Sequence, residues 1–144
     1  MNINDQPETT VTVQQATERV KQYARELKGA LPVDAVLEER TVSQGNCEDP
    51  SGGGFGKRVQ AWADYWVRGL DPAQYNAYFD AMKSWLSSHG WRVGADRRPG
   101  DMFLNAVHEG DEFTMSLAAN DKGGLALATS SPCVWPDGTP EPES

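Results

Sequence analysis

Apolar positions recur at three- and four-residue steps in two segments of the chain, the spacing of an amphipathic helix. The first segment predicts a helix over 13–28. Thr12 and Gln15 form a capping-box pattern at its start, and Gly29 and Pro32 follow its end.

The second helical segment is predicted to end at His89 and Gly90. Asp71 is placed to act as its N-cap, Pro72 suits the first helical position, and Gln74 completes a capping box. Bulky apolar residues then follow at helical spacing: Tyr75, Tyr78, Phe79, Met82, Trp85 and Leu86.

The remaining segments alternate apolar and polar residues with the period of a strand. Two strands are predicted between the helices, over 36–43 and 57–68, joined by a polar loop over 44–56. Four more are predicted after the second helix, over 91–96, 102–108, 112–120 and 125–131. Short connections between such strands favour antiparallel pairing. The predicted fold class is therefore α+β, with two helices packed on one face of a mainly antiparallel sheet in the order α-β-β-α-β-β-β-β.

With 144 residues, of which 38% are hydrophobic, the chain fits one domain. We expect a flexible polar tether over 1–12, a single α+β domain over 13–135 and a Pro-rich acidic tail over 136–144. No stretch approaches the roughly 20 apolar residues that span a bilayer, and no basic segment followed by an apolar one opens the sequence.

The charge balance narrows the range of partners. The chain has 13 Lys and Arg against 21 Asp and Glu, a net charge of −8, with the acidic residues scattered. Nucleic acid and anionic membrane surfaces both select clustered Lys and Arg, so neither is an expected partner. A cationic protein partner remains open, as does the simpler role of charge in keeping a small protein soluble.

Two cysteines indicate the compartment. Cys47 lies in the predicted polar loop and Cys133 in the segment Ser130–Pro140, both beside turn-forming residues. We expect a Cys47–Cys133 disulfide and hence an oxidising environment. Closing a loop of 86 residues stabilises the fold by about 4 kcal/mol in the chain-entropy treatment.

Two tryptophans give the candidate binding surface. On the strand over 57–68, Trp62 and Trp66 share one face with Arg58, Asp64 and Arg68, whereas small and apolar residues share the other. This tryptophan face either lines a groove or binding surface, or lies beneath the helices with the small-residue face outside. The buried arrangement is slightly favoured, because most tryptophans of a small domain belong to its core.

Other chemical patterns are weak. The run Gly52–Lys57 lacks the spacing of a phosphate-binding loop and is better read as a connection between strands. His89 and His108 lack partners at metal-ligand spacing, so structural roles are favoured. Neither Ser130 nor Ser131 lies in a nucleophile elbow.

Acidic residues also crowd the predicted turns, where calcium binding is an alternative to simple turn formation. No EF-hand spacing is present, and turn formation is favoured for these residues: Asp101, Glu109, Asp111, Glu112 and Asp121. No catalytic residue, metal site or cofactor is predicted.

Three segments carry a resemblance to a family: Ser130–Pro142, Tyr78–Trp91 with its Tyr-Phe-Asp-Ala start, and Arg98–Asp101. They are similar to the soluble part of small exported actinobacterial lipoproteins of unassigned function. The resemblance implies a domain on the outer side of the cytoplasmic membrane, attached through a lipidated cysteine upstream of residue 1. It implies no catalytic residues.

The sequence therefore predicts a non-enzymatic, monomeric accessory or recognition domain of the cell envelope, binding an envelope protein or a small ligand. Any binding is expected at Trp62, Trp66, Arg58 and Arg68 and in the 44–56 loop. One alternative is a cytoplasmic inhibitor or immunity-type protein that covers a basic partner. The other is a small hydrolase, which requires a carboxylate pair or a histidine in one pocket.

Overall fold

A computed structural model describes residues 9–48 and 55–139 of the chain. The elements run α1 (Val13–Leu27), a 3-10 turn η2 (Lys28–Ala30), β1 (Val36–Glu48), β2 (Phe55–Arg68), a 3-10 turn η3 (Pro72–Gln74), α2 (Tyr75–Ser88), β3 (Trp91–Asp96), β4 (Phe103–His108), β5 (Thr114–Ala119) and β6 (Leu125–Ser130). The strands form one antiparallel sheet in the order β1-β2-β6-β5-β4-β3. The predicted α+β fold class is confirmed.

Local sequence signals account for the start of α1 and for the start of the 3-10 turn that precedes α2. The Thr12 side chain accepts a hydrogen bond from the Gln15 backbone N–H, and the Gln15 side chain accepts one from the Thr12 N–H, so the predicted capping box is present. The Asp71 side chain accepts from the Ala73 N–H. It caps the 3-10 turn η3, and the α-helical hydrogen bonding of α2 begins only at Tyr75.

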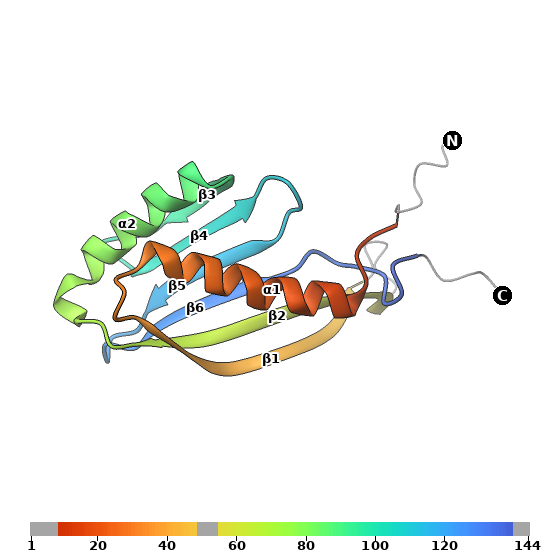
Figure 1. Cartoon of the computed structure of the whole chain (residues 1–144), viewed down its shortest axis with the longest axis horizontal. Coiled ribbons are helices and arrows are strands. Elements are labelled where there is room, and N and C mark those ends of the chain that lie inside the picture. The colour runs from red at the N-terminus through yellow and green to blue at the C-terminus, as the bar shows by residue number, and fades with distance from the viewer. Residues whose placement is uncertain (1–8, 49–54, 140–144) are drawn as a thin grey trace.

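Both helices pack on the same face of the sheet (Figure 1). Helix α1 crosses β2 and β6, and α2 lies over β3 and β4. The buried hydroxyl of Thr129 on β6 donates to the Val20 carbonyl of α1 at 2.8 Å, which fixes the helix to the centre of the sheet. The core lies between these two layers, and Phe79 and Leu127 within it are fully buried.

The two faces of β2 differ in what covers them. Ala61, Ala63 and Tyr65 are buried on the helix side, whereas Trp62 and Trp66 are half-buried on the opposite side. The slightly favoured expectation, that the tryptophans lie beneath the helices, is therefore wrong. Small side chains on β2 allow α1 to approach the sheet closely, and indole rings at these positions would hold it away.

Cys47 belongs to a strand, not to a loop. Strand β1 continues through Cys47 to Glu48 because it stays paired with β2 through Gly45 and Asn46, residues with little strand propensity of their own. The polar connection expected over 44–56 is correspondingly shorter, and its residues 49–54, including Gly52–Gly54, lie outside the described residues.

The expected Cys47–Cys133 disulfide is present, with its Cα atoms 6.2 Å apart. Beside it, Val134 exchanges two backbone hydrogen bonds with Val59 of β2, of 2.7 and 2.8 Å. The disulfide therefore fixes the segment that follows β6 against the far end of the β1–β2 pair.

The described beginning and end of the chain contact each other. The Thr10 N–H donates to the Gly138 carbonyl at 2.9 Å, and the Val13 N–H donates to the Pro136 carbonyl at 3.1 Å. Thr10 through Thr12 thus belong to the folded domain, which corrects the expected extent of the tether, while residues 1–8 lie outside the described part. Within residues 9–48 and 55–139, neither helix has the length and apolar content needed to cross a bilayer.

The β3–β4 turn is held to α2 by one arginine. The Arg98 guanidinium donates to both carboxylate oxygens of Asp96, at 2.9 and 2.7 Å, and to Asp80 of α2 at 2.9 Å. Only 12% of the Arg98 side chain and 18% of the Asp96 side chain are exposed. These hydrogen bonds hold the pKa of Asp96 well below its usual range.

Replacing Arg98 by methionine is expected to lower the free energy of unfolding at neutral pH by about 2 kcal/mol, because the partly buried Asp96 carboxylate loses its hydrogen bonds from the guanidinium and retains the Lys83 ammonium at 3.2 Å. The depressed pKa of Asp96 gives wild type a stabilisation that is present above about pH 4 and lost as the pH falls further. Denaturant unfolding across this range is expected to show a shallower acid loss in Arg98→Met. The exposed Arg92→Met is the control, and equal pH profiles in all three proteins would contradict this role of Asp96.

Candidate functional site

The face of the sheet opposite the helices, here called the open face, is covered by no described element. Strand register places on it residues from four adjacent strands, since directly paired residues lie on the same face. They are Trp62, Asp64 and Trp66 of β2, Ala126, Ala128 and Ser130 of β6, Thr114, Ser116 and Ala118 of β5, and Phe103, Asn105 and Val107 of β4. Small side chains in the middle strands thus lie between larger ones on both sides.

Trp62 and Trp66 lie on one side of this surface, over neighbouring glycines. A Cβ atom at Gly45 would lie 3.0 Å from the Trp62 ring, and one at Gly124 would lie 3.0 Å from the Trp66 ring. These contacts are tighter than most Cβ contacts, so a side chain at either position would require the indole to shift, and glycine leaves room for the rings where they lie. Both indole rings therefore pack closely against the backbone of neighbouring residues in the sheet.

Arginines cover Trp66 and are themselves paired. The guanidinium carbons of Arg40 and Arg68 lie 4.5 and 5.3 Å from the Trp66 ring centroid. Arg40 also pairs with Asp64 at 3.0 Å, and Arg68 pairs with Glu38 at 2.8 Å. The ion pairs leave this part of the open face close to neutral.

The structure unites only part of the predicted surface. Arg68 contacts Trp66, as its placement in the sequence predicts, but Arg58 lies over Trp135, 5.8 Å from that ring centroid. Arg40 also lies over the Trp66 ring, although the sequence did not single it out. The strand register is irregular between Glu39 and Thr41, so Arg40 is outside the regular pairing of β1 with β2.

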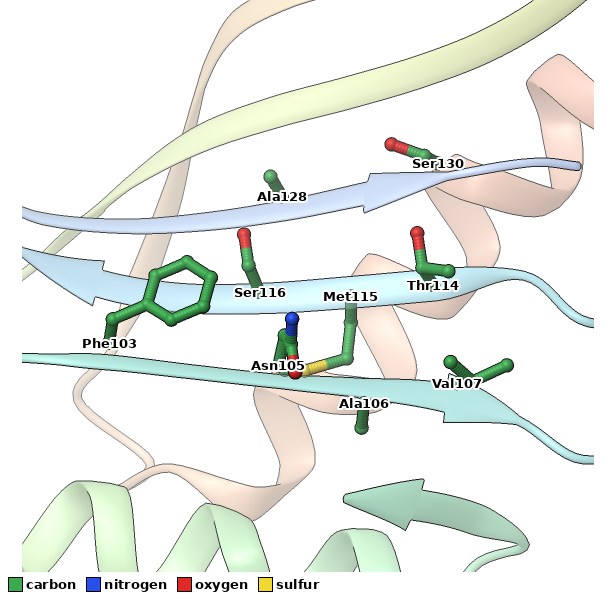
Figure 2. Close-up of a pocket in the computed structure, with 9 residues that line it drawn as sticks. All are labelled: Phe103, Asn105, Ala106, Val107, Thr114, Met115, Ser116, Ala128 and Ser130. Carbon is green, nitrogen blue, oxygen red and sulfur yellow. The ribbon is translucent and has the colours of Figure 1, made fainter. Parts of the chain in front are cut away.

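A hollow of about 240 Å³ lies in the open face between β4 and β6. Figure 2 shows the side chains of Ser116, Thr114 and Ser130 directed to one side of the sheet, with the Asn105 amide nitrogen turned toward Ser116. Phe103 and Val107 border the hollow. The Asn105 Oδ1 accepts from the Ala95 N–H at 2.7 Å, so its NH2 group stays available to a ligand.

Sequence reasoning missed this hollow. Its polar residues are ordinary strand positions, and only their pairing across three strands brings them together. In the sequence these polar residues alternate with buried residues such as Leu104, Met115 and Leu117, and this alternation indicates which residues lie on the exposed face. The strand order is also needed to show that the polar residues lie side by side.

Removing one indole at a time is expected to show that the tryptophans of the open face are accessible. Trp62→Phe or Trp66→Phe is expected to lower the fraction of fluorescence that acrylamide quenches, because both residues are half-buried and partly open to solvent. Trp91→Phe is the control, since only 4% of Trp91 is exposed and its loss removes unquenched signal. A quenched fraction that stays unchanged in both open-face variants would remove this surface as a binding site.

Ionisable side chains gather elsewhere, around Asp111. Its carboxylate accepts from the Tyr23 hydroxyl at 2.5 Å and lies 3.0 Å from His108 Nδ1 and 3.4 Å from Arg19. Burial raises the pKa of Tyr23, and the Asp111 contact raises it further, so the phenol remains protonated. Among the described residues no three metal-ligating side chains converge to hold an ion.

The hydrolase alternative requires a carboxylate pair or a histidine in one pocket, and the histidine–carboxylate contact at Asp111 is where this requirement is tested. A cavity of about 210 Å³ adjoins Asp111, and Thr10 is a hydroxyl residue in its lining. That hydroxyl donates to the Val11 carbonyl and accepts from the Trp135 N–H, and His108 is not among the lining residues. The geometry therefore offers no nucleophile–base pair in this cavity.

The other singled-out residues have structural contacts. The His89 ring stacks on Trp85 with centroids 3.9 Å apart, and its Nδ1 lies 2.7 Å from the Trp85 carbonyl at the end of α2. The buried Ser131 hydroxyl accepts from the Ala61 N–H and donates to the Pro132 carbonyl. Ser130 is the exception, because it lies at the hollow.

Comparison of the chain with protein families, curated proteins and solved structures finds no match.

Proposed function

We propose that this chain is a non-enzymatic recognition domain of the cell envelope, which binds its partner through the open face. The observation that carries the proposal is a sheet face that no described element covers and that combines two half-buried tryptophans with a hollow of about 240 Å³. Concave sites that join apolar walls to a few polar groups are typical of ligand recognition.

The disulfide supports the extracytoplasmic part of the proposal. Cys47 and Cys133 are bonded to each other, and such bonds persist in oxidising compartments. The resemblance to exported lipoproteins adds an anchor upstream of residue 1. The described chain begins and ends at one end of the sheet, where the Thr10 N–H donates to the Gly138 carbonyl.

A photocrosslinking amino acid at Ser116, in the producing cell, tests this proposal. Ser116 lies in the hollow, so one discrete adduct with an envelope component is expected. The matched position is Ser84, which is exposed on α2 on the other side of the molecule and is expected to give none. No adduct from Ser116, or the same adducts from both positions, would overturn the proposal.

A second candidate function rests on the net charge of −8, which suits an inhibitor that covers a basic protein. This reading places the chain in the cytoplasm, where the Cys47–Cys133 bond would be reduced. Free thiols in the native cell, together with a one-to-one complex with a basic protein, would favour it over envelope recognition.

A further inference from the structure

A groove separate from the open face lies between α1 and β1, here called the α1–β1 groove. Its volume is about 720 Å³, and its lining includes Lys21, Arg25, Lys28, Val33, Val36 and Tyr65. Helix α1 lies over β2 and β6, and β1 lies beyond it at the edge of the sheet (Figure 1). The groove therefore lies on the helix side of the sheet, beside α1, where β1 extends beyond the helix.

One wall of the groove is cationic. Lys21, Arg25 and Lys28 follow each other at steps of four and three residues, which places them on one side of α1. Lys21 pairs with Glu18 at 3.1 Å. Across the described ranges Arg25 and Lys28 have no ion-pair partner, in a protein whose net charge is −8. Two cations are thus available to a ligand, and together they outnumber Glu39, the one carboxylate in the groove lining.

The floor holds a polar group without a partner. Tyr65 is 7% exposed, it lines the groove, and no described residue hydrogen-bonds its hydroxyl. Burial raises the pKa of Tyr65, and the neighbouring charge of Glu39 raises it further while Arg25 opposes them. The hydroxyl is therefore a donor at neutral pH. Because Tyr65 lines the groove, an acceptor bound there can take a hydrogen bond from this hydroxyl.

The remaining wall is apolar and exposed. Val33 is 91% exposed and Val36 is 57% exposed, the two large hydrophobic residues most open to solvent in the described chain. Both line the groove beside the cations. Single exposed valines are ordinary, but two that share a groove with cations and a hydroxyl donor form one amphipathic site.

We propose that the α1–β1 groove binds a monomeric single-chain amphiphile, with its anionic head among Arg25, Lys28 and the Tyr65 hydroxyl and its apolar chain over Val33 and Val36. Charge complementarity selects an anionic head, and the valines select an apolar chain. An anionic bilayer is a poorer occupant, because the net charge of −8 repels it while a single molecule meets only the local cations.

Titration with dansyl-undecanoate, a fluorescent fatty-acid analogue, tests this site. Wild type is expected to bind it saturably and to bind its uncharged methyl ester more weakly. The Arg25→Gln and Lys28→Gln double variant is expected to weaken binding about tenfold or more, because two charge-assisted contacts are lost. Tyr65→Phe, which removes only the hydroxyl, and Val33→Ser are each expected to weaken it severalfold.

Arg92→Gln, at an exposed cation on the opposite edge strand, is the control and is expected to bind as wild type does. Absence of saturable binding, or equal affinity for the acid and its ester, would overturn the proposal. So would unchanged binding in the double variant, or cosedimentation with phosphatidylglycerol vesicles without binding of the monomer. The Ser116 crosslinks report on the open face alone, so the two proposals fail separately.

Discussion

Replacing Cys47 and Cys133 together by alanine is expected to lower the free energy of unfolding by about 4 kcal/mol. The bond closes a loop of 86 residues, and in the chain-entropy treatment its main effect is to restrict the unfolded chain. In the native state, the bond holds the segment after β6 beside β2, where Val134 pairs with Val59. Denaturant unfolding at neutral pH measures the loss.

Reductant supplies the matched control for this variant. Wild type in excess reductant is expected to unfold at the same denaturant concentration as the double alanine variant, and reductant is expected to leave the variant unchanged. If wild type and variant differ by less than about 1 kcal/mol, the disulfide contributes little and the fold holds its C-terminal segment by other contacts.

The second large effect is expected at Phe79, the aromatic residue that anchors α2. Phe79 is fully buried, and Phe79→Ala is expected to cost about 3 to 4 kcal/mol, because transfer energy is lost and a cavity remains. The guanidinium carbon of Arg98 lies 5.3 Å from the ring centroid, so the substitution also removes a surface on which the β3–β4 turn rests.

The control for Phe79 lies on the same helix. Ser84 is exposed, and Ser84→Ala is expected to change the free energy of unfolding by no more than about 0.5 kcal/mol. Calorimetry of the two variants separates packing from any general effect on the helix. Similar small losses in both would mean that α2 is not packed firmly on β3 and β4.

The elements of this fold follow from short-range signals. The capping pair Thr12 and Gln15 marks the start of α1, and the period-two segments after Trp91 mark β3 to β6. Such signals fix element type and order because they act within a few residues. The disulfide was also predictable, since the chain has only two cysteines.

The strand order and the choice of the face that the helices cover depend on pairing between distant segments, which local sequence signals do not predict. Strand β6 lies between β2 and β5, so Ser130 pairs with Thr114 on one side and with Trp62 on the other. The alternation of β2 separates its two faces but does not say which one the helices cover. That choice depends on whether α1 packs better on alanines or on indoles, which is a property of the assembled layers.

The α1–β1 groove illustrates the same limit. Arg25 and Tyr65 are 40 residues apart in the sequence, and nothing local to either indicates that they share a groove. Lys21, Arg25 and Lys28 resemble the solvated side of any surface helix. Only the packing of α1 across β2 brings them to the same groove as Tyr65.

One measurement tests most directly whether this domain works outside the cytoplasm. The protein is alkylated during lysis of its producing cell, without reductant, and its intact mass is then measured. The account predicts a mass two hydrogen atoms below that of the reduced chain, with no alkyl group added until reductant is supplied. Two alkyl groups on the freshly isolated protein would contradict it, because Cys47 and Cys133 would then be free thiols in the compartment where the protein acts.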